Sequence, residues 1–169
     1  MAKEVLGCRR LPGVLVVDRY HAYHTIHCRL QYCYAHLLRN LTDLLKEFPE
    51  NEAIRCFVEG LAPLLAAAIQ ARKFPGSTRQ FRQQAARIKR PIVDGINAKA
   101  WHPAIQTFQT IFREKAHRRY HWATDRRIPA DHNLAERDLR PLVIARKISF
   151  GSQSDAGAKT RETLIGVFT

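Results

Sequence analysis

The chain has 169 residues, enough for one hydrophobic core with an appendage but too few for two comfortable domains. Its 28 Lys and Arg residues exceed its 15 Asp and Glu residues, so its surface should attract polyanions and nucleic acid is the leading partner. No apolar run approaches a membrane span and the N-terminal sequence has no signal-peptide pattern, which argues against a membrane partner and predicts a cytoplasmic location. The four cysteines are irregularly spaced and are expected to stay reduced.

The first expected elements lie within residues 13–49. The segment GVLVVD contains four consecutive apolar residues without alternation, which is typical of a strand buried on both faces. A second strand is expected near Leu30 to Cys33, and it passes into a helix that ends before Pro49. The apolar stripe of this helix consists of Leu37, Leu38, Leu41, Leu44 and Leu45. Two strands followed by a helix favour an α/β fold.

Residues 50–128 show helical periodicity. One stripe consists of Leu61, Leu64, Leu65, Ala68 and Ile69, and Pro63 within it allows a kink or a late start. FPGS at residues 74–77 is expected to form a turn. A later stripe, expected to face the core, consists of Trp101, Ile105, Phe108 and Phe112. These segments predict a mainly helical insertion.

The most basic stretch of the chain lies inside this insertion and contains no acidic residue. Its seven cations are Arg72, Lys73, Arg79, Arg82, Arg87, Lys89 and Arg90. They are candidates for contact with nucleic acid, and the alternative is a solvated helix face.

Residues 129–169 combine a charged helix with a Gly/Ser-rich loop. Asp131 is the expected N-cap, and Pro141 is expected to interrupt the helix. The cations of this helix either balance neighbouring acids or contact phosphates; they are Arg137, Arg140, Arg146 and Lys147. The loop FGSQSDAGAK would let backbone N–H groups approach phosphate, but it lacks the spacing of a P-loop, which argues against an ATPase.

Two carboxylates are candidates for catalysis. Asp18 directly follows the first strand, where it either caps the turn or holds a ligand at the carboxyl end of a sheet. Glu136 either forms a surface ion pair with Arg140 or joins Asp18 as a metal ligand. Carboxylates that hold a pair of divalent ions support phosphoryl transfer between nucleic-acid strands, and Mg²⁺ suits oxygen ligands.

Cys33 and His36 form a C-x-x-H pair where the second strand passes into the helix. Zn²⁺ uses such ligands, although no second pair has the spacing of a zinc finger. The alternative is a buried cysteine beside a hydrogen-bonded histidine. The remaining histidines show no spacing that selects a site; they are His21, His24, His102, His117, His121 and His132.

Four segments, in the order GVLVVDRYHAY, YCYAHLLRN, NLAERDLRP and ARKISFGSQSDAGA, resemble the insertion-sequence transposases of family 66 from about Gly13 to Ala158. The resemblance implies a ribonuclease-H-like fold of the DDE class. Enzymes of this class cut and join DNA at insertion-sequence ends with Mg²⁺ or Mn²⁺. The resemblance also implies that Asp18 is the second catalytic acid and Glu136 the third, and the C-x-x-H pair is part of the family pattern. DHN at residues 131–133 stands where the family usually has an NN pair.

The resemblance predicts a partial ribonuclease-H-like fold with a truncated sheet. Residues 1–49 would hold its C-terminal strands, residues 50–128 a helical insertion, and residues 129–169 the catalytic helix and a basic tail. The family's first catalytic aspartate lies on an earlier strand, and no aspartate precedes Asp18. We therefore expect an incomplete transposase that has little activity alone and that self-associates or pairs with full-length transposase. The alternatives are a non-catalytic DNA-binding remnant that inhibits or assists a full-length transposase, and a zinc-dependent structural module.

Overall fold

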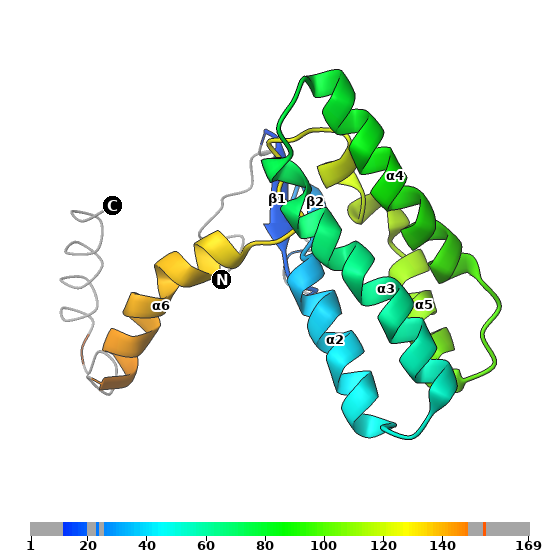
Figure 1. The fold of residues 1–169 in the computed structure, drawn as a ribbon. Helices are drawn as coiled ribbons and strands as arrows, with labels where there is room; N and C mark the ends of the chain where they lie inside the picture. Colours follow the sequence, from blue (N-terminus) through cyan, green and yellow to red (C-terminus); the bar gives the residue numbers. More distant parts are fainter. Residues whose placement is uncertain (1–11, 20–22, 24–25, 149–153, 155–169) are drawn as a thin grey trace. The chain divides into compact units, whose positions relative to one another are not determined.

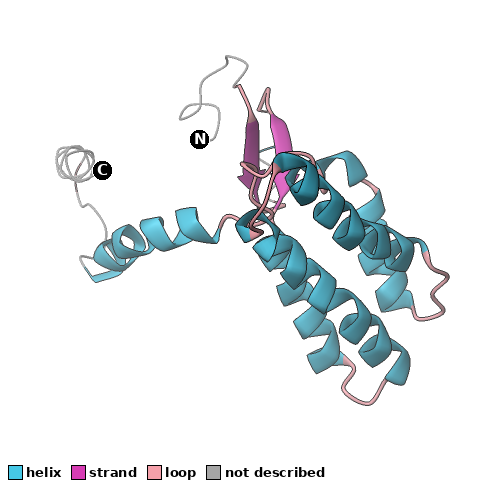
Figure 2. Cartoon of the chain, turned by 45° about the horizontal axis from the view of Figure 1, so that its top comes forward, coloured by secondary structure: helices cyan, strands magenta, loops and turns pink. Residues whose placement is uncertain are grey.

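The computed structural model describes residues 12–19, 23, 26–148 and 154 of the chain (Figure 1). The chain divides into two compact units, Met1–His132 and Asn133–Thr169. Strands and helices both occur and helix predominates, so the expected α/β class is confirmed at this level (Figure 2). None of the described helices is both long and apolar enough to cross a membrane.

The two expected strands are confirmed and form a small parallel sheet. Strand β1 (Val14–Val17) pairs with β2 (Arg29–Tyr32), and Val17 lies opposite Tyr32 in the register. Gly13 precedes β1 with a φ of 91°, a backbone conformation that favours glycine. Val17, Leu30 and Tyr32 form a small apolar cluster on the sheet.

Helix α2 (Tyr34–Glu47) follows β2 after a single residue, Cys33, and the expected passage from strand to helix is confirmed. Helix α3 (Glu52–Gln70) begins at an N-cap, Asn51, whose side chain accepts a hydrogen bond from the backbone N–H of Ile54. Pro63 lies inside α3, so the late start considered for this helix is wrong. The cap fixes the earlier start, and packing of the apolar face outweighs the hydrogen bond that proline cannot donate.

The remaining helices of the first unit follow a short 3₁₀ turn, η2 (Ala71–Lys73). Helix α4 (Thr78–Asn97) begins with a capping box formed by Ser77 and Gln80. Helix α5 (Pro103–Arg113) is followed by two further 3₁₀ turns, η3 (Ala116–Arg118) and η4 (His121–Ala123). The helical character predicted for residues 50–128 is therefore confirmed.

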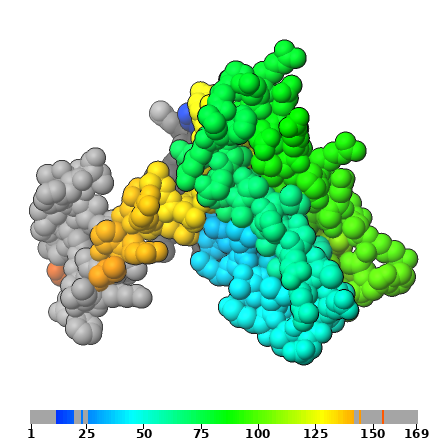
Figure 3. All heavy atoms as spheres, viewed as in Figure 1, coloured from blue at the N-terminus to red at the C-terminus, as the bar shows by residue number. Residues whose placement is uncertain are grey.

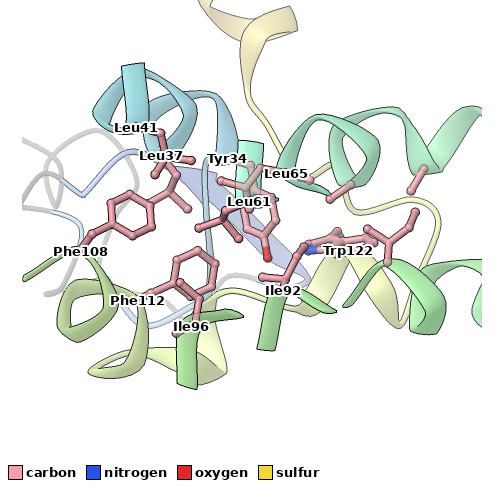
Figure 4. Close-up of a cluster of buried hydrophobic side chains, with 14 of the residues drawn as sticks. Tyr34, Leu37, Leu41, Leu61, Leu65, Ile92, Ile96, Phe108, Phe112 and Trp122 are labelled. Atoms are coloured by element: carbon pink, nitrogen blue, oxygen red, sulfur yellow. The ribbon is translucent and has the colours of Figure 1, made fainter. Parts of the chain in front are cut away.

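Side chains from α2, α3, α4 and α5 converge on one core, which Trp122 of η4 completes (Figure 4). The labelled side chains are Tyr34, Leu37, Leu41, Leu61, Leu65, Ile92, Ile96, Phe108, Phe112 and Trp122. The Tyr34 ring meets the rings of Phe112 and Trp122 edge-on, at centroid distances of 6.1 and 5.9 Å. Burial of these apolar and aromatic surfaces supplies most of the favourable free energy of folding.

Buried polar groups join the sheet to the segment that carries η3 and η4. The Gln31 side chain donates to the carbonyls of Tyr32 and Arg119 and accepts from the backbone N–H groups of His121 and Trp122. The hydroxyl of Tyr34 donates to the same Arg119 carbonyl at 2.7 Å. These contacts satisfy buried backbone groups far apart in the sequence, and so fix the segment that carries η3 and η4 against β2.

Three further expectations from the sequence are wrong. Trp101 is 81% exposed, because α5 begins only at Pro103 and a residue before the helix does not follow its periodicity. Helix α6 (Asn133–Ile148), in the second unit, begins two residues after Asp131, which is therefore not adjacent to its first turn. Pro141 lies inside α6 and does not interrupt it.

Candidate active site and nucleic-acid interface

Asp18 and Cys33 lie at one edge of the parallel sheet. Each directly follows a strand, Asp18 after β1 and Cys33 after β2, and the backbone N–H of Cys33 donates to the Val17 carbonyl at 2.8 Å. Asp18 is half-buried and stands at the carboxyl end of a strand, where open α/β sheets hold their ligands. The sheet thus sets a carboxylate and a thiol side by side in the register.

Three potential ligands of a metal ion converge next to this edge. One atom each of Cys33, His36 and His132 lies within 4.8 Å of the others. The rings of His36 and His132 stack with their centroids 5.2 Å apart and their planes 24° apart. The C-x-x-H pair identified in the sequence therefore gains a third member from a segment distant in the sequence.

His132 is a residue that sequence spacing missed. It belongs to no short motif with Cys33 or His36, so only the fold brings it to them. One signal was present, since His132 lies in the tripeptide that departs from the NN pair usual in the resembled family. Its neighbour Asp131 is half-buried.

The Cys33 thiol is only 2% exposed. Burial raises the pKa of Cys33 above its usual range, because a thiolate loses the solvation it would have in water. The backbone N–H groups of His132, His36 and Ala35 act in the opposite direction and lower this pKa. Burial therefore disfavours a thiolate at Cys33, whereas the neighbouring backbone N–H dipoles favour one.

Glu136 lies in the first turn of α6, in the second unit, and is exposed. Arg137 and Arg140 are exposed on the same helix, and Arg146 and Lys147 lie in its last turns. Asp18 and Glu136 belong to different units of the chain, so their pairing stays a prediction.

Four basic residues of α4 form a surface that we call the arginine face of α4, defined by Arg79, Arg82, Arg87 and Arg90. All four are exposed, while Phe81, Ala85, Ile88, Ile92 and Ile96 form the buried side of the helix. Helix α4 lies at the surface in the space-filling view (Figure 3, green). Lys89 is half-buried, with its ammonium nitrogen 4.7 Å from the centroid of the Tyr120 ring. Arg72 and Lys73 are exposed in η2. Apart from Lys89, the predicted DNA-contacting residues of the first unit are therefore freely accessible.

Two of the features expected from the sequence lie outside the described residues. The Gly/Ser-rich loop FGSQSDAGAK falls there except for Ser154, and so does Cys8. The other three cysteines, Cys28, Cys33 and Cys56, are free thiols.

Comparison with known proteins identifies the family of the chain. Residues 1–160 match the model of the transposase IS66 family, and the chain belongs to that family. The chain is also similar to an uncharacterized protein, y4jD, of Sinorhizobium fredii (strain NBRC 101917 / NGR234), with 26% identity over 168 residues that cover 88% of this chain. The match covers 32% of y4jD, so the chain spans about a third of the length of this curated relative. No solved structure matches the chain significantly. The resemblance to the insertion-sequence transposases of family 66 found in the sequence is therefore confirmed.

Proposed function

We propose that this chain contributes Asp18 and Glu136 to a DDE-type active site that cleaves and joins DNA at insertion-sequence ends. The observation that carries the proposal is the position of Asp18, directly after a strand of a parallel pair in a member of a transposase family. Because two parallel strands end together at that edge, a carboxylate there favours the role of ligand over that of turn cap alone.

The proposed fold is ribonuclease-H-like, with β1 and β2 as part of a larger sheet. Within the described residues β1 pairs only with β2, which leaves its other edge for further strands. An open edge of apolar residues favours pairing with additional strands, from a longer protein or from a second copy of the chain. This supports the expected self-association or pairing with a full-length transposase.

The two carboxylates suit Mg²⁺ or Mn²⁺ because these ions prefer hard oxygen ligands. Asp18 is half-buried and Glu136 is exposed, so both are within reach of solvent and of DNA. Divalent ions at such a site activate the attacking oxygen and stabilise the leaving oxygen. The side chains of Asp18 and Glu136 would hold and orient the ions, while nearby arginines would bind the phosphates of the DNA.

The short segment that precedes α6 permits Asp18 and Glu136 to bind the same metal ions. The backbone N–H of Tyr34, at the start of α2, donates to the Ala130 carbonyl at 2.8 Å, so the segment before α6 is anchored beside the end of β2. Glu136 follows Ala130 by six residues, and six residues span at most about 22 Å. No long connection separates the sheet edge from the first turn of the proposed catalytic helix.

Mn²⁺ binding tests this proposal without requiring turnover. Electron paramagnetic resonance of free Mn²⁺ is measured during titration of the wild-type chain, of Asp18→Asn and of Glu136→Gln. Each substitution should weaken binding at least about tenfold, because each removes a ligand and even loss of an outer partner costs about 10–100-fold. Asp43→Asn is the matched control, since Asp43 is an exposed carboxylate paired with Lys46 in α2. Unchanged affinity in both active-site variants would refute the assignment.

A second candidate function, non-catalytic DNA binding that inhibits or assists a full-length transposase, is favoured by the arginine face of α4. Four guanidinium groups on one exposed helix face suit the phosphates of a DNA backbone. Such a surface would bind DNA whether or not metal ions are held elsewhere. The two functions therefore differ in their dependence on Asp18 and Glu136.

Salt-dependent DNA binding tests the arginine face. Fluorescence anisotropy of labelled duplex DNA carrying the sequence that flanks the coding region is measured over a range of salt concentrations. The double variant Arg82→Gln, Arg90→Gln should weaken binding and lower the salt slope by about 1 for each phosphate that it no longer binds. Arg113→Gln, which removes an exposed charge from the end of α5, is the control. An equal effect for each charge removed would show that net charge, and not this face, governs binding.

A further inference from the structure

The cluster of Cys33, His36 and His132 is separate in its chemistry from the carboxylates of the proposed active site. It offers one sulfur and two ring nitrogens, whereas Asp18 and Glu136 offer oxygens. Its three ligand atoms lie within 4.8 Å of one another, and they come from two segments that meet only in the folded chain. The C-x-x-H pair alone does not include His132, which the fold adds to it.

Backbone contacts hold both segments of the cluster in place. Cys33 is the N-cap residue of α2 and His36 lies in its first turn, so the helix sets their spacing. The hydrogen bonds from Cys33 N–H to Val17 and from Tyr34 N–H to Ala130, both 2.8 Å long, tie β1, α2 and the segment before His132 together. The side chains of the cluster therefore start from a fixed frame, which reduces the entropy lost when a ligand orders them.

We propose that Cys33, His36 and His132 form a Zn²⁺ site, with water as the fourth ligand. Zinc binds thiolate at about 2.3 Å and imidazole at about 2.0–2.1 Å, which in a tetrahedron puts neighbouring ligand atoms about 3.4–3.6 Å apart. The cluster lies within about 1.5 Å of that spacing, so small side-chain rotations complete it. One thiolate with two imidazoles is a borderline-soft ligand set that favours Zn²⁺ over Mg²⁺.

The burial of the cluster suits a metal ion. Cys33 is nearly inaccessible, and the Nδ1 atoms of His36 and His132 are withdrawn from solvent. Zn²⁺ would replace an unfavourable solitary thiolate by a charge-compensated one, while the stacked imidazole rings need only tilt to direct nitrogen lone pairs at the ion. A purely structural role would need only apolar packing of the cysteine, and would not require two histidines beside it.

The proposed ion would cross-link two distant parts of the sequence. It joins the start of α2 to His132, the residue immediately before α6. A cross-link that closes a long loop stabilises the fold chiefly by restricting the unfolded chain. This inference does not rest on the proposed transposase activity, since it concerns only the folded first unit.

Cobalt substitution of the full chain tests the site. The metal-free chain is titrated with Co²⁺ and then with Zn²⁺, and the visible and near-ultraviolet spectra are recorded. We expect one Co²⁺ per chain with tetrahedral d–d bands and a thiolate-to-cobalt charge-transfer band, both of which Zn²⁺ displaces. The variant Cys8→Ser, Cys28→Ser, Cys56→Ser retains Cys33 as its one thiol and should give the same spectrum.

Single-ligand variants identify the binding atoms. His132→Asn should weaken Co²⁺ binding more than about tenfold, because loss of an outer-shell partner alone costs about 10–100-fold. His117→Asn, which changes an exposed histidine, should leave the affinity unchanged. Cys33→Ser should abolish the charge-transfer band, and circular dichroism checks that each variant folds. If Cys33→Ser fails to fold, the spectrum of the variant that keeps only Cys33 decides the sulfur ligand. Absence of stoichiometric binding, or binding that survives His132→Asn unchanged, would overturn the proposal.

Discussion

The side chain of Gln31 should stabilise the first unit more than any other buried amide of that unit. Gln31 is fully buried on β2, and its Oε1 accepts from the N–H groups of His121 at 2.9 Å and Trp122 at 3.3 Å. Gln31→Leu keeps the volume but leaves both donors without an acceptor. Each unsatisfied buried donor costs about 1–3 kcal/mol. The N–H of Trp122 is buried and that of His121 is only partly buried, so the second donor costs less than the first. We therefore expect the free energy of unfolding to fall by about 2–4 kcal/mol.

Urea unfolding measures this loss through the fluorescence of buried Trp122. The background variant Trp101→Phe removes the signal of the exposed indole, which is 81% accessible. Gln109→Leu is the matched control, since Gln109 is also buried but donates only to the carbonyls of Gly95 and Ala98 near the end of α4. We expect the control to cost about 1 kcal/mol. Equal losses for the two variants would refute the assignment of the larger cost to the His121 and Trp122 donors.

Two further predictions concern pH and glycine. Burial lowers the pKa of His121 below its usual value, as does the positive charge of Arg29, so the unfolded state binds more protons and the free energy of unfolding should fall as pH drops below about 6.5. Urea unfolding in the presence of a chelator should show a smaller fall for His121→Asn than for the wild-type chain, and an identical fall would contradict this prediction. Gly60→Ala should raise the free energy of unfolding by about 0.5–1 kcal/mol, because Gly60 lies exposed in α3 with open space for a Cβ. Gly76→Ala should instead lower the free energy of unfolding, because its φ of 133° is strained for alanine and the new Cβ would meet Gln80 Oε1 at 2.8 Å; thermal melts that shift both variants in one direction would refute the argument.

Local pattern is enough to predict much of the fold. The apolar run of β1, the leucine stripe of α2 and the periodicity of α3 and α5 are each short-range signals, and each gives the element type correctly. The errors fall at helix boundaries and at prolines. Trp101 continues the spacing of Phe108 and Phe112, which predicts a place in the core, but the Pro103 start of α5 leaves it outside the helix.

The candidate sites are harder to predict from the sequence than the helices and strands, because they depend on long-range contacts. The C-x-x-H pair is visible in the sequence because a helix turn brings residues three apart together, whereas His132 joins the pair through a long-range contact that spacing does not encode. Sequence pattern does not single out Gln31 for a similar reason, since its partners lie in and between η3 and η4, far along the chain. The arginine face of α4 is predictable as a basic stretch, but only the burial of the opposite helix face shows which cations are presented together.

The two proposed metal sites can coexist because their ligands differ in kind. Asp18, after β1, offers hard oxygens, which suit Mg²⁺ and Mn²⁺, and Cys33, after β2, offers a sulfur, which these ions avoid. Zn²⁺ binds oxygens as well, but the thiolate and two imidazoles give it a tighter site, so limiting Zn²⁺ should occupy the cysteine cluster first. The two proposals are therefore separable by experiment. A chelator selective for Zn²⁺ should remove the cross-link between α2 and His132 while Mg²⁺ in excess remains available to the carboxylates, and Mn²⁺ binding should then persist if Asp18 and Glu136 are its ligands.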